Sequence, residues 1–321
     1  MAGTNDSTAN AFISIFFKLE TEGGAITKLV VVILLTVFSI YVNCNMLLAL
    51  RSKPVFKVSP RYILFAHMLY NDSIHLSLTT LMYALLLAFI KLAKAMCSLI
   101  MFLSVTTFLN APLNLALMSL ERYVAICYPL RHAEIATQKR TYIAIVLIWF
   151  FGSVNILSDI LFAAVEDPNF LYMQMFCSRE QIFIKKWQLD VYNAYNVLYF
   201  VTVTLIIVFT YIRILITARS VSSKKDSAKK AQRTVLLHLI QLGLCLSSFI
   251  YGSIERALYT MTGSNAVLFN HLRYLNFVIV LILPRCLSPL IYGLRDDAVR
   301  PIFKHTFCHG TRRTAHKVEN L

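Results

Sequence analysis

The sequence predicts an all-α membrane protein: a bundle of seven transmembrane helices followed by a short amphipathic helix on the cytoplasmic side. Its 321 residues are 58% hydrophobic and only 15% charged, and the mean hydropathy is +0.64. A water-soluble domain carries about a quarter charged residues, so much of this apolar surface is expected to face lipid. Seven apolar stretches are also long enough to cross a bilayer as helices of about 20 residues.

The predicted spans follow one another closely, and several exceed about 25 residues, which permits tilt in the membrane. They are 26–50, 62–90, 96–126, 142–165, 191–218, 235–261 and 267–294. An odd number of spans puts the two termini on opposite sides. We therefore expect an extracellular tail (1–25), a transmembrane domain (26–294), and a cytoplasmic amphipathic helix with a tail (295–321).

The distribution of basic residues predicts the orientation. With an extracellular N-terminus, 20 Lys and Arg lie in cytoplasmic segments and 7 in extracellular ones, as the positive-inside rule requires. Topology and anionic inner-leaflet lipid then explain the net charge of +15, so membrane lipid is an expected partner and nucleic acid is not. On the outer tail, Asn5-Asp6-Ser7 forms a sequon, and we expect glycosylation of Asn5.

The third predicted span ends in the string ERYVAICYPLRH, residues 121–132. A charged pair beside so apolar a helix costs free energy, so the presence of Glu121 and Arg122 indicates that the pair has a function. An arginine that snorkels to the membrane edge is the alternative. The whole string resembles the signature of vertebrate olfactory receptors, a branch of the rhodopsin-like G-protein-coupled receptors. The resemblance implies a small-molecule odorant as ligand and a heterotrimeric G protein, of the stimulatory or olfactory type, as partner.

Residues elsewhere in the chain match the same family, but some positions depart from its pattern. Ser288 stands where the family has Asn, an aromatic pair expected in the sixth span is absent, and the second outer loop has one cysteine. These departures indicate a divergent member of the fish type, expected in the plasma membrane of olfactory cilia. The matching motif residues outside the third span are Asn43, Asp72, Tyr211, His238, Pro289 and Tyr292.

The resemblance also implies a disulfide between Cys97 and Cys177. Cys97 precedes Arg122 by 25 residues, which is the family's spacing from its extracellular cysteine to its arginine. Cys177 is the cysteine of the second outer loop. The remaining cysteines fall in the membrane or the cytoplasm, where disulfides are rare.

Activation, as the resemblance implies it, is a population shift between a closed and an open cytoplasmic face. Arg122 would pair with Glu121 in the closed state and meet the G protein in the open state. No acid at the foot of the sixth span offers Arg122 a second partner, so appreciable basal activity is expected. The residues expected to act in coupling are Glu121, Arg122, Tyr123, Tyr211, His238, Pro289 and Tyr292.

The ligand is expected between the outer halves of the third, fifth, sixth and seventh spans. Helical periodicity selects one face of each span, and these faces carry no carboxylate that could anchor a cationic amine. An apolar, aromatic pocket with a few hydroxyls and an amide suits a small, mostly uncharged molecule. The alternative is that half of these side chains face lipid or a neighbouring helix. The candidates are Met101, Ser104, Val105, Phe108, Leu109, Tyr192, Tyr195, Asn196, Tyr199, Phe249, Ile250, Ser253, Tyr274, Val278 and Ile282.

Arg285 fits no part of the family pattern and lies in the otherwise uncharged run FVIVLILPRCLSPLIYG. Helical rise places Arg285 about 15 Å and Asp72 about 18 Å from the inner edge. Because an unpaired Arg at the bilayer centre costs roughly 3 kcal/mol, we expect the two to pair. In related receptors this Asp commonly holds a sodium ion, whose place the guanidinium would take. The alternative is Arg285 in a wet cavity. The predicted buried polar network is Asn43, Asp72, Arg285 and Ser288.

Other classes of protein are less well supported. His67 and His75 are eight residues apart with no evident third ligand, so packed or hydrogen-bonded histidines are favoured over a metal site. No catalytic or phosphate-binding motif appears, and we expect neither an enzyme nor a cofactor. Inverted repeats typical of transporters are not visible. The remaining alternatives are a non-olfactory peptide or lipid receptor and, from another class, a transporter.

Overall fold

The computed structural model describes residues 24–52, 54–179, 181–221, 243–244, 246–263 and 265–295. Within these ranges it describes all side chains except those of 218–221, 249, 266 and 292–295. The expected glycosylation site Asn5, the coupling residue His238 and nearly all of the expected amphipathic helix therefore lie outside the described residues.

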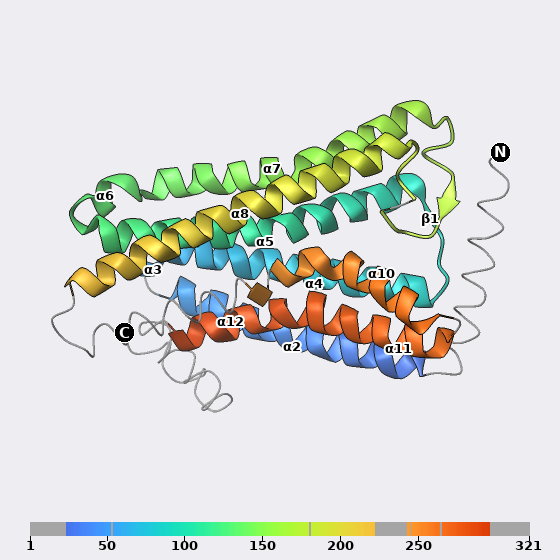
Figure 1. Cartoon of the computed structure of the whole chain (residues 1–321), viewed down its shortest axis with the longest axis horizontal. Coiled ribbons are helices and arrows are strands. Elements are labelled where there is room, and N and C mark those ends of the chain that lie inside the picture. The colour runs from blue at the N-terminus through green and yellow to red at the C-terminus, as the bar shows by residue number, and fades with distance from the viewer. Residues whose placement is uncertain are drawn as a thin grey trace, which may run out of the picture.

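Long helices run side by side along most of the length of the molecule (Figure 1). They are α2 (Ala25–Arg51), α4 (Pro60–Leu87), α5 (Lys94–Cys127), α7 (Gln138–Glu166) and α8 (Lys186–Val221). The last described part of the chain forms η2 (Ser248–Ile250), α10 (Tyr251–Thr262), α11 (Ala266–Asn276), η3 (Phe277–Ile282) and α12 (Leu283–Arg295). Short elements close the two ends of the bundle: α3 (Pro54–Val58), η1 (Pro129–Arg131) and α6 (His132–Ile135) at one end, β1 (Leu92–Ala93) and β2 (Gln174–Met175) at the other.

These helices agree with the predicted spans except at their edges and in three places. The short elements were not predicted, the sixth span is described only in part, and the seventh is not regular. In the seventh span, α11, η3 and α12 follow without a break, but η3 is a π-helix. Among the described residues, five helices are long and apolar enough to cross a membrane. Helix α4 is not one of these five, because its polar residues, which include Asp72 and His75, lower its mean hydropathy.

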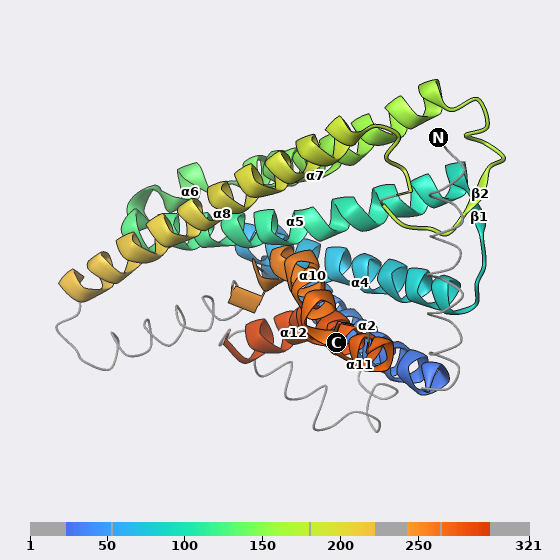
Figure 2. The ribbon, with the colours of Figure 1, turned by 45° about the vertical axis from the view of Figure 1, so that its right-hand side comes forward.

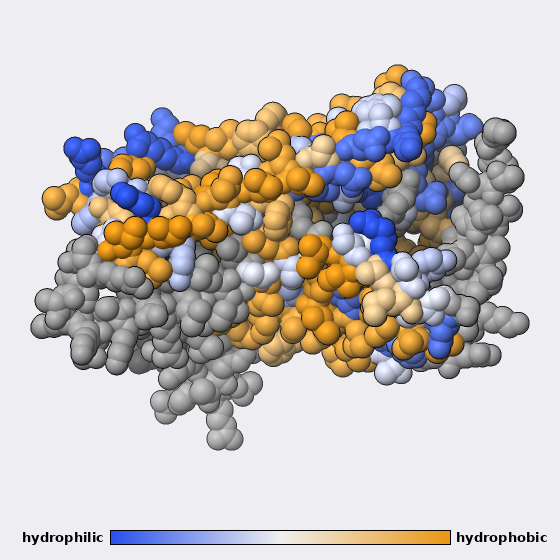
Figure 3. All heavy atoms as spheres, viewed as in Figure 1, coloured by the Kyte–Doolittle hydropathy of each residue, from blue (hydrophilic) through white to orange (hydrophobic). Residues whose placement is uncertain are grey.

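Helix α5 is the centre of the bundle. In its most apolar window 61% of residues are buried, against 22–28% in α2, α7 and α8. Figures 1 and 2 show α5 between the α7–α8 side and α4. The outer helices expose many large apolar side chains, and hydrophobic residues follow their length while hydrophilic ones gather toward the ends (Figure 3). Such a surface is typical of helices that face lipid.

Local sequence explains how the helices begin and approach one another. Pro60 occupies the first turn of α4, where a missing N–H costs no hydrogen bond. The Thr137 hydroxyl accepts a hydrogen bond from the N–H of Arg140 and caps α7. Gly152 lets α7 lie against α5, because a Cβ there would collide with the side chain of Asn110. A larger residue at 152 would therefore force the two helices apart.

Candidate functional site

The two ends of the bundle differ in composition and are named here by their main features. The disulfide end holds β1, β2 and the connection between α10 and α11, and the Arg122 end holds α3, η1 and α6 (Figure 1). The predicted extracellular side corresponds to the disulfide end.

A covalent bond fixes the loop after α7 to the start of α5. Cys97 and Cys177 form a disulfide with their Cα atoms 5.3 Å apart, which confirms the predicted pair. Strands β1 and β2 pair nearby, with Leu92 opposite Met175. Cys97 and Met175 belong to a buried cluster that also contains Met101. Met101, expected to line the ligand pocket, therefore packs in the core beneath this loop.

Ion pairs add further links at the disulfide end. The Asp167 carboxylate lies next to the Lys94 ammonium, which donates a hydrogen bond to it and lowers the pKa of Asp167 below its ordinary value. Most pairs join segments that are distant in the chain, so they hold loops and helix ends together. The pairs are Lys94–Asp167 at 2.7 Å, Arg179–Asp159 at 3.2 Å, Lys185–Glu166 at 3.4 Å and Arg273–Glu255 at 2.6 Å.

Arg179 of the outer loop is half-buried, with its side chain 10% exposed, and contacts α7 and α8. Its Nη2 donates to Asn155 Oδ1 at 2.5 Å and to Asp159 Oδ2 at 3.2 Å. Gln188 Nε2 donates to the other oxygen of Asp159 at 3.3 Å. The guanidinium carbon lies 4.0 Å from the ring centroid of Tyr192. One face of Tyr192, an expected ligand residue, is therefore covered by a cation that reasoning confined to the spans missed.

Five of the expected pocket residues come together between α5 and α8. The hydroxyl of Tyr199 donates to the carbonyl of Leu109, and the hydroxyl of Tyr195 donates to the carbonyl of Phe151. These hydroxyls hold helices together, so their rings and the aliphatic side chains form the shared apolar surface. The expected pocket residues in this α5–α8 cluster are Val105, Phe108, Leu109, Tyr195 and Tyr199.

The seventh span faces a different neighbour from the one expected. The Tyr274 hydroxyl donates to the carbonyl of Lys28 on α2 at 3.3 Å, and the Lys28 ammonium lies 5.6 Å from the Tyr274 ring centroid. Ile282 is buried in a small core with Leu76 and Cys286. These two side chains therefore pack toward α2 and α4, which were not among the expected walls of the pocket.

The remaining pocket candidates have varied surroundings. Ile250 and Ser253 are exposed, and Ser253 accepts a hydrogen bond from Arg256, so neighbouring helices do not enclose them as expected. Ser104 is buried, and its carbonyl accepts a bond from the Thr107 hydroxyl. Asn196 and Val278 are half-buried, and the side chain of Phe249 lies outside the described set.

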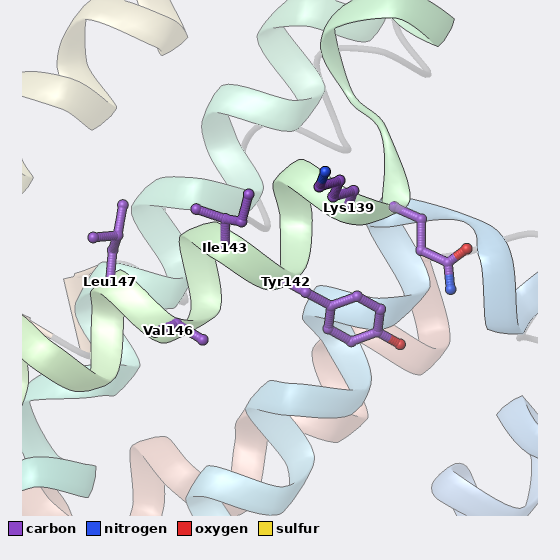
Figure 4. A pocket seen from close by; sticks show the side chains of 6 residues that line it. Lys139, Tyr142, Ile143, Val146 and Leu147 are labelled. Carbon is purple, nitrogen blue, oxygen red and sulfur yellow. The ribbon is translucent and has the colours of Figure 1, made fainter.

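A groove of about 560 Å³ lies elsewhere, along the first turns of α7. Figure 4 shows its walls, which come from this one helix. The groove lies toward the Arg122 end on an outward-facing surface, far from the α5–α8 cluster. It therefore offers no enclosed ligand site. Its lining residues are Gln138, Lys139, Tyr142, Ile143, Val146 and Leu147.

At the Arg122 end, Glu121 lies between two bases. Its Oε2 is 3.9 Å from Arg122 Nε, and its Oε1 is 3.2 Å from Nε2 of His132. The expected Glu121–Arg122 pair is therefore long, and His132, eleven residues further on, is the nearer partner. Arg122 Nη2 is buried without a hydrogen-bond partner among the described residues. The His at the end of the motif could have signalled this contact.

The structure describes fewer contacts for the other expected coupling residues. The Tyr123 ring packs edge-on against Phe209 of α8, with centroids 5.6 Å apart. Tyr211 is half-buried and Pro289 is buried. The side chain of Tyr292 is not among those described.

A buried polar layer crosses the middle of the bundle. Arg285 Nη1 lies 3.3 Å from Asp72 Oδ1, and the two side chains are 4% and 1% exposed. The two other members of the predicted network, Asn43 and Ser288, make hydrogen bonds to different residues. Asn43 Nδ2 donates to Ser73 Oγ at 2.9 Å, and the Ser288 hydroxyl donates to the carbonyl of Pro284 at 2.9 Å.

His67 belongs to a hydrogen-bonded chain across three helices. Trp149 Nε1 of α7 donates to His67 Nε2 at 2.9 Å, so that ring nitrogen is an acceptor. The other nitrogen, Nδ1, then carries the proton that reaches Asn114 Oδ1 of α5 at 3.1 Å. His67 is thus a neutral, structural residue, in line with the hydrogen-bonded alternative.

Comparison with known proteins identifies the family. Residues 42–292 match the family model described as 7 transmembrane receptor (rhodopsin family). The chain belongs to this family. It is 34% identical to odorant receptor 131-2 of Danio rerio, over 99% of this chain and 95% of the relative. It is 25% identical to olfactory receptor 2T1 of Homo sapiens, over 93% of this chain and 80% of the relative.

Membership settles the class of protein. The chain is a rhodopsin-family receptor with an all-α, seven-transmembrane fold, a multi-pass protein of the plasma membrane and not an enzyme. Receptors of this family take a small-molecule ligand and a G protein as partners. The α5–α8 cluster occupies the middle of these two helices, and Arg122 lies near the end of α5.

Proposed function

We propose that this receptor detects a small, mostly uncharged odorant and activates a heterotrimeric G protein of the stimulatory or olfactory type. Relatives named odorant or olfactory receptors in fish and mammals support this reading. The proposed setting is the membrane of olfactory cilia, with residues 1–25 outside, 26–294 in the membrane and 295–321 inside. Glycosylation of Asn5 belongs to the same proposal.

The observation that carries the proposal is the composition of the α5–α8 cluster. Its members are apolar or aromatic, and neither residues 95–120 of α5 nor residues 191–212 of α8 include a charged side chain. A ligand that displaced part of this packing would gain affinity by burying apolar surface, not by ionic contact. The charged residues nearby are already engaged, because Arg285, which lies against Phe108, is paired with Asp72, and Arg179 is bonded to Asp159 and Asn155. A strongly charged ligand would have to break these bonds.

The coupling role rests on the Arg122 end. The distance from Arg122 Nε to the Glu121 carboxylate exceeds that of a normal hydrogen bond, and the same carboxylate also contacts His132. We infer that release of Arg122 toward the G protein requires little free energy. Tyr123, Tyr211, His238, Pro289 and Tyr292 are proposed as the surrounding coupling residues.

A ligand-site experiment tests the proposal. Cells that express the receptor with a stimulatory G protein are screened with small odorants and amino acids, and cyclic AMP is measured. Val105→Phe should fill the α5–α8 cluster and raise the half-maximal agonist concentration about tenfold or more, the equivalent of about 1.4 kcal/mol. Leu99→Phe, an exposed residue of the same helix, is the matched control and should leave potency unchanged. Equal potency for Val105→Phe and wild type would move the ligand site elsewhere.

A further inference from the structure

Arg285 is bound to more than its carboxylate partner. Its Nη2 donates to the carbonyl of Phe108 at 3.3 Å, and its guanidinium carbon lies 6.0 Å from the Phe108 ring centroid. With the 3.3 Å contact to Asp72, one side chain of α12 therefore joins α4 and α5 in the middle of the bundle. Arg285 is 3% exposed, so these contacts are shielded from bulk water.

The Phe108 carbonyl needs a partner because of Pro112. In an α-helix the carbonyl of residue 108 accepts a hydrogen bond from the N–H of residue 112. Residue 112 is a proline within α5, and proline has no N–H to donate. A buried carbonyl without a donor is costly. The Arg285 guanidinium supplies that donor, so the break in α5 and the charge on α12 complement each other.

The π-helix η3 sets the direction of Arg285. A π-helical segment adds a residue to the turn, and one residue corresponds to about 100° of rotation around the helix axis. If η3 were α-helical, Arg285 would point away from Asp72 and from the Phe108 carbonyl. The irregular segment is itself supported, because the Ser248 hydroxyl of η2 donates to the carbonyl of Val280 at 3.0 Å.

The charge at this site is already balanced. Asp72 is 1% exposed, and a carboxylate so deeply buried needs a cation nearby. A mobile ion such as sodium would place a second positive charge beside the Arg285 guanidinium for a single carboxylate. His75, a titratable group of the same layer, is hydrogen-bonded to Thr107 at 3.3 Å and offers no second negative charge. The donor set therefore does not fit a bound sodium ion.

We propose that Arg285 is a built-in cation and a positioning residue: it takes the place of a mobile sodium ion beside Asp72 and fixes α12 to the proline-broken turn of α5. The stability of the receptor is then independent of sodium. Removal of the guanidinium leaves the buried Asp72 carboxylate without its cation, and its Oδ2 already has no hydrogen-bond partner among the described residues. Such a carboxylate attracts a sodium ion. If Arg285 were merely structural, its removal would not make the stability of the receptor depend on sodium.

The test uses the purified full-length receptor and needs no agonist, so it is independent of the proposed function. Thermal unfolding is compared in sodium chloride and in choline chloride at equal ionic strength. Wild type should unfold at the same temperature in both salts. Arg285→Met should be less stable in choline and gain several degrees in sodium, whereas Asp72→Asn with Arg285→Met should recover part of the stability and lose the sodium effect. Arg256→Met, an exposed arginine, is the control and should behave as wild type.

Several outcomes would overturn the proposal. One is stabilisation of wild type by sodium over choline, and another is the absence of a sodium effect in Arg285→Met. If Arg285→Met does not yield protein, surface expression of the single and double variants replaces unfolding, and the double variant must exceed the single one. Pro112→Ala restores the helical donor to Phe108, so it should reduce the loss caused by Arg285→Met. Strictly additive losses for these two changes would contradict the positioning role.

Discussion

At the disulfide end, a covalent bond and the ion pairs of Lys94, Arg179, Lys185 and Arg273 link the described segments to one another. At the Arg122 end, Glu121 makes a 3.9 Å contact with Arg122 and a closer one with His132. The first set of contacts fixes loops to helix ends, whereas the second can exchange partners at little cost. The disulfide end can therefore keep its arrangement while the contacts of the Arg122 end, the proposed coupling face, change.

The middle layer joins helices that run between the two ends. Arg285 joins α4, α5 and α12 between the ends, and it lies in the first turn of α12, three residues after the end of η3. Packed interiors switch between discrete arrangements and do not deform continuously. We therefore expect a ligand that alters the packing near η3 to change the contacts of Arg285 before those of the Arg122 end.

The largest effect is expected from the disulfide. Cys97→Ser and Cys177→Ser should each abolish most surface expression, because removing a disulfide typically costs about 2–5 kcal/mol. The double variant should be no worse than either single one, since both remove the same bond. Cys44→Ser, a free and exposed cysteine, is the control and should express normally. Flow cytometry of intact cells measures the result, and clearly additive defects would contradict a shared bond.

A smaller effect is expected at the Arg122 end. Glu121→Gln removes the charge that holds Arg122 and should raise basal cyclic AMP. Because partly exposed ion pairs contribute about 0–1 kcal/mol, the rise should be no more than about fivefold. His132→Ala frees Glu121 for Arg122 alone and should lower basal activity instead. Changes of the same sign in both variants would show that His132 does not compete with Arg122.

The sequence was sufficient for features that depend on distance along a helix. Asp72 and Arg285 could be matched because charges are rare in apolar spans and each residue adds a fixed rise. The α5 face with Val105, Phe108 and Leu109 was found from periodicity for the same reason. The disulfide followed from the family resemblance, and the structure contains it.

Features that depend on an irregular helix or on loops could not be predicted from helical periodicity. The count along the seventh span assumed a regular helix, and the π-helical turns of η3 change which residues face the bundle. Tyr274 contacts α2 and Ile282 packs beside Leu76 of α4, neighbours that the expected pocket did not include. Arg179 and His132 belong to connections whose path is set by tertiary contacts, so no periodicity points to their partners Asp159 and Glu121.

The smallest expected effect sharpens the account of the disulfide end. The hydrogen bond from Lys94 lowers the pKa of Asp167, so the pair stabilises the folded state above the ordinary value of 3.8 and the contribution is lost as pH falls through the lower, folded-state value. Asp167→Asn should lower the unfolding temperature at neutral pH by no more than about 3 °C. The difference from wild type should shrink as the pH falls below 3.8. Glu166→Gln, whose 3.4 Å pair with Lys185 is about half exposed, is the matched control and should show neither change. A difference between wild type and Asp167→Asn that stayed constant from neutral to acidic pH would mean that packing, and not charge, holds the start of α5 to the end of α7.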